Sequence, residues 1–178
     1  MKDKKKITIN RVFARANHET FKIPPIRELL RRYVGNSKGW IDPYAGRNSP
    51  AEITNDIDPK MPTSFHLLAS EFAKGLGREM FRGVLFDPPY SYRQIKEHYS
   101  KLGLPVTQLD TSYRFYRGVM NPLAKRIRKG GYAISFGWNS NGFGKVSGFE
   151  LIEVLLVAHG LHHNDTIVTV ERKLAKLK

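Results

Sequence analysis

The order of short apolar segments and helical segments is the feature that most limits how this chain can fold. Two long apolar runs, residues 149–159 and 166–172, flank a polar turn and predict a C-terminal antiparallel hairpin. Before them, strands that alternate with helices favour an α/β sheet that is mainly parallel. The five shorter segments typical of strands are residues 39–41, 51–55, 64–68, 83–86 and 132–138.

Helical patterns separate most of these strands. Residues 24–34 open with two prolines and place four apolar side chains at i, i+3, i+4 and i+7, which predicts an amphipathic helix. A long basic helix is predicted over residues 112–129, and Gly130-Gly131 should end it. Shorter helices are expected over residues 70–75 and 91–101.

The chain is expected to form one domain after a basic lead-in. Its 178 residues can bury one sizeable core. We expect residues 1–16 to be a flexible lead-in and residues 17–178 to be the domain. No apolar run approaches the roughly 20 residues of a transmembrane helix, and the start lacks the apolar part of a secretion signal. A cytoplasmic protein without a membrane partner is the expectation.

Charge and cysteine content limit the partners and the chemistry. Thirty basic against 16 acidic residues give a net charge of +14, and the basic residues cluster inside the chain as well as at its ends. This charge indicates a polyanionic partner such as nucleic acid. The chain has no cysteine, which excludes disulfides, cysteine-bound zinc and a thiolate nucleophile.

The motif with the most chemical content is Asp87-Pro88-Pro89-Tyr90, directly after the apolar strand 83–86. Ligands of open α/β sheets bind at the carboxyl ends of strands. The amino group of a nucleic-acid base is a poor nucleophile, because its lone pair is delocalised into the ring. Asp87 and the Pro88 carbonyl, held rigidly by the prolines, could each accept one N–H bond and favour a pyramidal nitrogen. The Tyr90 ring offers a face on which an extruded base could stack.

This tetrapeptide after a strand resembles the amino-methyltransferases of DNA, which methylate N6 of adenine or N4 of cytosine. The resemblance covers the chain from about residue 17 and implies a Rossmann-like sheet that uses S-adenosylmethionine. The leading Asp87 is the usual adenine form, so the resemblance implies an adenine N6 methyltransferase of DNA that flips its target base. Methylation at C5 of cytosine is excluded, because it needs a cysteine adduct.

The resemblance also implies a small form, like those of phages or mobile elements, because no segment is long enough for a target recognition region. Sequence choice would then come from short loops, a homodimer or a separate partner. Cofactor-binding residues follow from the same resemblance. Phe21 and Lys22 belong to the segment 17–24, which resembles the family segment that helps to wall the cofactor site. Asp42-Pro43-Tyr44-Ala45-Gly46 resembles the glycine motif that contacts the methionine part of the donor. Asp56, followed by Ile57, stands where an acid binds the ribose hydroxyls.

Further residues are candidates for contact with the substrate. Phe136 and Trp138 leave the fifth strand on the same side and could wall the flipped base, or pack under the rim of the sheet. Tyr92 and Arg93 could touch base or phosphate, or belong to a solvated helical turn. The histidines in the turn between the last two strands are expected to be a chance cluster, so no metal site is predicted.

Departures from the family pattern leave alternatives open. Arg47 and Asn48 follow Gly46, where small residues are usual, and the link from Gly46 to Ala51 is too short for a crossover helix. No acid marks the end of the third strand. Two alternatives therefore remain: the same chemistry on RNA or on N4 of cytosine, and a methyltransferase fold that binds nucleic acid or a partner without catalysis.

Overall fold

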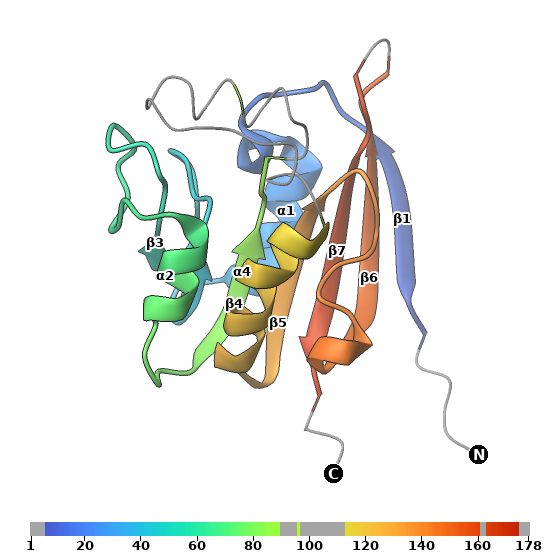
Figure 1. Ribbon diagram of the computed structural model, residues 1–178. Coiled ribbons are helices and arrows are strands. Elements are labelled where there is room, and N and C mark those ends of the chain that lie inside the picture. The colour runs from blue at the N-terminus through green and yellow to red at the C-terminus, as the bar shows by residue number, and fades with distance from the viewer. Residues whose placement is uncertain (1–5, 90–95, 97–112, 161–162, 175–178) are drawn as a thin grey trace, which may run out of the picture.

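The computed structural model describes residues 6–89, 96, 113–160 and 163–174, of which residues 113–115 are described by their backbone alone. Within these residues one seven-stranded sheet has the order β1-β6-β7-β5-β4-β2-β3 (Figure 1). Neighbours are parallel except that β7 is antiparallel to both β5 and β6. The mainly parallel α/β sheet with antiparallel C-terminal strands is confirmed. The strands are β1 (Thr8–Phe13), β2 (Trp40–Asp42), β3 (Ile53–Thr54), β4 (Phe81–Phe86), β5 (Ile127–Gly137), β6 (Phe149–Ala158) and β7 (Thr166–Lys173).

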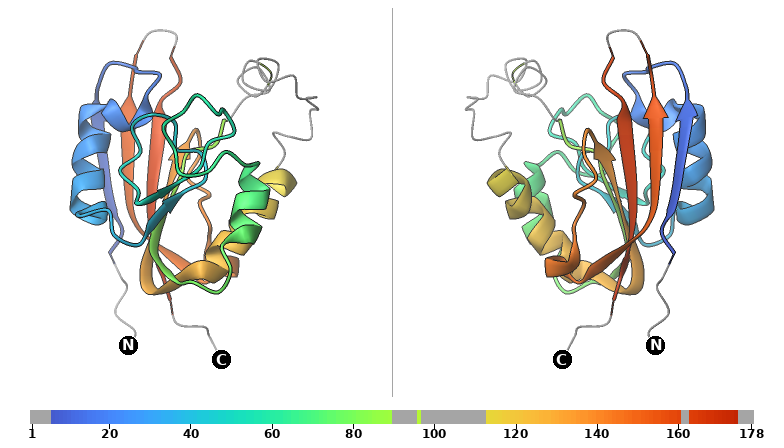
Figure 2. Two further views of the ribbon diagram at one scale, coloured as in Figure 1. Left: turned by 90° about the vertical axis from the view of Figure 1, so that its left-hand side faces the viewer. Right: turned by 90° about the vertical axis from the view of Figure 1, so that its right-hand side faces the viewer.

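Helices cover both faces of the sheet (Figure 2). On one face lies α1 (Pro24–Val34), preceded by the 3₁₀ turn η1 (Thr20–Lys22), and on the other lie α2 (Ala69–Gly75) and α4 (Tyr113–Arg126). Each face has its own apolar core, which is why the central strands are buried on both sides. A second short 3₁₀ turn, η3 (Lys145–Ser147), precedes β6. No helix in the described part of the chain is long and apolar enough to cross a bilayer.

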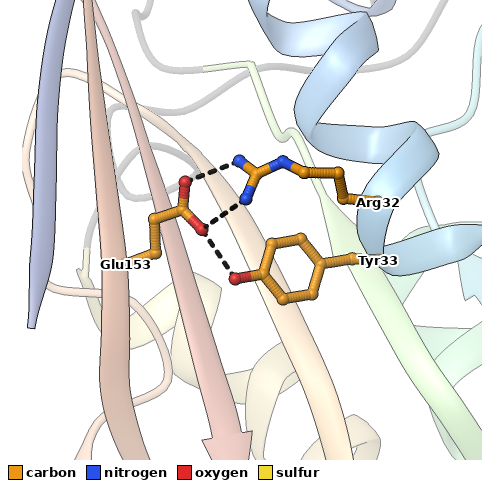
Figure 3. A network of polar contacts seen from close by, with 3 residues as sticks. All are labelled: Arg32, Tyr33 and Glu153. Atoms are coloured by element: carbon orange, nitrogen blue, oxygen red, sulfur yellow. Dashed lines mark hydrogen bonds and ion pairs between the residues drawn. The ribbon is translucent and has the colours of Figure 1, made fainter.

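The helix α1 is attached to the sheet by its predicted apolar stripe and by one polar network. Ile26, Leu29 and Leu30 are buried. On β6, the carboxylate of Glu153 accepts bonds from the Arg32 guanidinium at 2.7 and 3.2 Å and from the Tyr33 hydroxyl at 2.6 Å (Figure 3). Burial alone would raise the pKa of Glu153, but these hydrogen bonds and the Arg32 charge outweigh it and lower the pKa.

The first strand corrects one expectation. Residues 8–13 lie inside the expected flexible lead-in, yet they form β1, which pairs in parallel with β6 from Thr8 opposite Glu153 to Phe13 opposite Ala158. The pattern was hard to recognise because most of the strand is exposed and only Val12 packs against the core. Its pairing partner is also far away in the sequence.

Two other expectations also change. The segment 64–68 is no full strand and makes only an isolated bridge, Phe65 to Asn55. The long helix ends at Arg126, before the glycine pair, and β5 begins at Ile127. The register of β4 against β5 then shifts between Phe81 and Gly83, so residues 128–131 bulge out of the ladder. The helix expected over residues 91–101 lies outside the described residues, apart from residue 96.

Candidate active site

A cavity of about 680 Å³ opens at the carboxyl ends of the parallel strands. The chain leaves β2 towards β3 on one side and returns to β4 on the other, and such a switch point is where open α/β sheets bind ligands. The lining comes from the loop after β2, the turn after β4, residues 16–21 before α1 and the turn between β6 and β7. It is completed by residues that follow β3, by residues at the start of α2 and by the end of β5. The cavity size is typical of small-molecule sites.

The loop after β2 holds its shape without a helix. The buried carboxylate of Asp42 accepts hydrogen bonds from the Tyr44 amide at 2.9 Å and the Ser49 hydroxyl at 2.6 Å. Gly46 has a positive φ of 54°, which favours glycine. Its amide donates to the Asp56 carboxylate at 3.0 Å, so the loop is tied directly to the end of β3. A loop held by these hydrogen bonds therefore connects β2 to β3, in place of the crossover helix for which the sequence is too short.

Asn55 is a second anchor of this loop and was not recognised in the sequence as such. Its side-chain amide is buried and donates to the Pro43 and Leu67 carbonyls, both at 3.0 Å. Its side-chain oxygen accepts from the Leu67 amide at 2.9 Å. One side chain thus fixes both the glycine loop and the residues before α2 at the cavity wall.

Asp87 follows the buried strand β4 and lines the cavity. Burial raises its pKa to about 6, although a hydrogen bond from the Thr20 side chain acts in the opposite direction. Burial also raises the pKa of Asp42 to about 7; its hydrogen bonds with Ser49 and Tyr44 lower it, and the negative charges of Asp87 and Asp56 raise it further. The ends of β2, β3 and β4 therefore concentrate three carboxylates at one site.

The turn after Asp87 is held by a side chain of α4, which lies on the face of the sheet opposite α1. The Tyr116 hydroxyl, on α4, donates to the Pro89 carbonyl at 2.5 Å. The Tyr116 ring also packs edge-to-face on Phe86, with centroids 6.4 Å apart. Proline ring geometry and this bond together hold the turn in one orientation.

Most of the predicted site residues lie around this one cavity. Those that line it are Phe21, Pro43, Tyr44, Ala45, Gly46, Asp56, Ile57, Asp87, Pro88, Pro89 and Trp138. Their roles stay predictions. Tyr90, Tyr92 and Arg93 lie outside the described residues.

Three predicted residues do not line the cavity. Asp42 is buried beneath the glycine loop and acts on the site through Tyr44 and Ser49. Lys22 pairs with Glu19 at 2.6 Å. Phe136 is a core residue whose ring lies 5.2 Å from that of Phe21. The predicted alternation of side chains along the strand is correct. Phe136 comes two residues before Trp138 and is buried in the core, so it does not reach the cavity. Trp138 is 46% exposed at the cavity rim.

The segment 17–24, expected to wall the cofactor site, lines the cavity with residues 17–21, but the sequence patterns missed the wall formed by the turn after β6. His159 is buried there; its ring nitrogens contact the Ala14 carbonyl at 2.8 Å and the Thr166 hydroxyl at 2.9 Å. It thereby joins the end of β1 to the start of β7. In the described residues, no group of three His, Cys, Asp or Glu side chains is arranged to hold a metal ion.

Comparison with known proteins identifies the fold. No family model and no curated protein sequence matches the chain. The structure of the 1,6-didemethyltoxoflavin-N1-methyltransferase of Burkholderia thailandensis, which holds S-adenosylhomocysteine, matches with a TM-score of 0.58 and 13% identity over 85% of this chain and 77% of its own. TrmN from Thermus thermophilus matches with a TM-score of 0.57 and 16% identity over 85% of this chain.

The alignment covers only 49% of TrmN, so this chain spans about half the length of that protein. The N-methyltransferase NodS from Bradyrhizobium japonicum WM9 matches over 84% of this chain and 94% of its own, with a TM-score of 0.54 and 10% identity. Identities this low show the fold and no particular family. The protein has the Rossmann-like fold of the S-adenosylmethionine-dependent methyltransferases.

Proposed function

We propose that this protein transfers a methyl group from S-adenosylmethionine to N6 of adenine in DNA. The observation that carries the proposal is that Asp87-Pro88-Pro89 opens into the same cavity as the Gly46 loop and Asp56. A methyltransferase fold supplies a donor site at this end of the sheet. The aspartate and proline turn supplies acceptors for an amino group, and the net charge of +14 suits a nucleic-acid substrate.

The residues at the end of β2 and β3 fit the donor. Gly46 has open space where a Cβ would stand, so the backbone can be approached closely. The Asp56 carboxylate accepts from the Gly46 and Asp58 amides at 3.0 and 2.8 Å and keeps further lone pairs for ribose hydroxyls. The three carboxylates around the cavity also suit the positive charge of a sulfonium. When bound, the donor supplies an electrophilic methyl group.

Asp87 then acts on the amino group of the base. With a pKa of about 6, its carboxylate is mostly ionised at neutral pH and can accept one N–H bond, while it is basic enough to take up a proton. The new N–C bond would form as the S–CH3 bond of the donor breaks and a neutral thioether leaves. The amino nitrogen would become positive and release one proton, which Asp87 is placed to accept. Thr20 orients the carboxylate, and Tyr116 holds the adjoining turn.

The test is methyl transfer from labelled donor to DNA, followed by nucleoside analysis of the product. The wild type should yield N6-methyladenine, and Asp87→Ala should lose at least about a hundredfold in rate, the range expected for a positioned acid or base. Glu79→Ala removes an equal charge from an exposed position and should retain full activity. Equal rates for wild type and Asp87→Ala would refute the mechanism.

Other products would identify the alternatives. Formation of N4-methylcytosine, or methyl transfer to RNA alone, would change the proposed substrate but leave the proposed chemistry in place. If calorimetry detects no binding of the donor, either alone or in the presence of DNA, the result would favour a protein that binds nucleic acid without catalysis.

A further inference from the structure

The edge strand β1 presents a face that none of the described helices covers. Val12 and Ala14 pack against the core on the α1 side, so the alternation of the strand directs Arg11, Phe13 and Arg15 to the other side. The Ala14 amide donates to the Ala158 carbonyl at 3.0 Å, which continues the pairing beyond the last residue of β1. On this side α4 lies over β4 and β5 and leaves β1 open (Figure 1). Phe13 is 70% exposed and Ile9 is 66% exposed.

Phe13 stands at the mouth of the candidate active site. It pairs with Ala158, the last residue of β6. A Cβ on Gly160 would lie 3.2 Å from the Phe13 ring, so glycine leaves room for that ring beside the turn between β6 and β7. The chain then continues directly into residues 16–21, which line the cavity. An exposed aromatic ring thus lies within a few residues of the cavity rim.

The cations on this face are available to a ligand. In the described part of the chain Arg11 and Arg15 are exposed and form no ion pair. Exposed aromatic rings between basic side chains are how proteins bind single-stranded nucleic acid, because bases stack on the rings and cations contact the phosphates. A second copy of this chain fits less well, since it would bring the same cations and a net charge of +14 against each other.

We propose that this β1 face binds the DNA strand that flanks the target base. A neighbouring base stacks on Phe13, and Arg11 and Arg15 contact the phosphates on either side. The inference rests on the proposed function, because it leads the strand into the cavity of Asp87.

Fluorescence anisotropy with a labelled single-stranded oligodeoxynucleotide, without donor, tests this surface. Phe13→Leu should weaken binding about tenfold, because base–aromatic stacking is lost, whereas Phe13→Trp should retain it and show fluorescence quenching by DNA. The double variant Arg11→Ser/Arg15→Ser should reduce the slope of log K against log salt by about 1.4, since each phosphate contact on a single strand contributes about 0.7. Lys38→Ser/Lys74→Ser is the matched control, with two exposed lysines removed from outside the β1 face.

The inference would be overturned if Phe13→Leu binds the oligodeoxynucleotide as tightly as wild type does, or if the control variant changes the salt slope by the same amount. It would also be overturned if the β1 variants lose a dimer and keep their affinity for DNA. Sedimentation of each variant checks the last. Methyl transfer is measured separately. If wild type transfers no methyl group but Phe13→Leu still loses DNA binding, the proposed function fails and the surface stands. If Phe13→Leu methylates DNA with unchanged KM and affinity, the surface fails and the function stands.

Discussion

Asp42 is a buried carboxyl group at the end of β2, and its replacement by Asn should remove the pH dependence that this residue gives to the folding free energy. The pKa of Asp42 rises from 3.8 to about 7 on folding, mainly through burial. Between these values the folded protein binds the proton more tightly than the unfolded chain does. Stability from this residue therefore falls as pH rises through this window, and the loss is complete above pH 7.

The size of the effect follows from the two pKa values. A rise from 3.8 to about 7 corresponds to about 4 kcal/mol of unfolding free energy. Asn carries no charge and resembles the protonated carboxyl, but its amide fits the bonds from Tyr44 and Ser49 less well, at a total cost of about 1 kcal/mol. We expect Asp42→Asn to be about 3 kcal/mol more stable than wild type at pH 8 and about 1 kcal/mol less stable at pH 4.

Urea unfolding followed by tryptophan fluorescence at pH 4, 6 and 8 measures this difference. Asp87 titrates in both proteins, so its contribution largely cancels in the comparison. Glu79→Gln changes an exposed acid and should run parallel to wild type across the range. Stability curves for Asp42→Asn and wild type that stay parallel in pH would refute the assignment of a raised pKa to Asp42.

Three further predictions concern the site and its supports. In pH–rate profiles the acid limb of kcat/KM should lie near pH 6, where Asp87 titrates. Because the Thr20 hydrogen bond lowers the pKa of Asp87, the limb should move to higher pH in Thr20→Ala but not in Thr20→Ser. A limb that stays in place in Thr20→Ala would contradict this. Glu153→Gln should lower the unfolding free energy at pH 7 by about 2 kcal/mol, a figure reduced because Arg32 is half-exposed. The lowered pKa of Glu153 means that this loss should shrink in urea titrations as pH falls from the ordinary 4.5 through the lowered pKa of the folded state. Gly142→Ala would place a Cβ 2.3 Å from the Glu171 carboxylate, which should release the Phe143 and Gly144 amides and speed their hydrogen exchange. Gly118→Ala, in open space on α4, should leave that exchange unchanged.

The elements with long periodic patterns were predictable. The helix α1 matches its expected bounds because the two prolines and the apolar stripe agree with each other. β6 and β7 are each long, apolar and separated by a polar turn, so their local signal is strong. The Asp87 turn was recognisable because a fully buried strand precedes it.

Elements defined by distant partners were not predictable in this way. β1 is a strand because β6 offers it an edge, and that partner lies more than 140 residues away. Ile127 fits the apolar stripe of a helix and the first position of β5 equally well, so the helix appeared too long. The same reason applies to one wall of the site: the turn with His159 reaches the cavity beside residues 14–21 only after β1 has paired with β6.

The place of β7 in the sheet has a consequence for how the molecule assembles during synthesis. β7 is the last strand in chain order, yet it lies between β5 and β6 and bonds to both. Until residues 166–173 have left the ribosome, the ladder of β1 and β6 has no hydrogen-bonded connection to the strands that carry Asp42 and Asp87. Contacts of such large sequence separation close slowly. The cavity, whose walls come from both parts of the sheet, is therefore completed by the final docking of β7 and cannot bind a ligand in full before it.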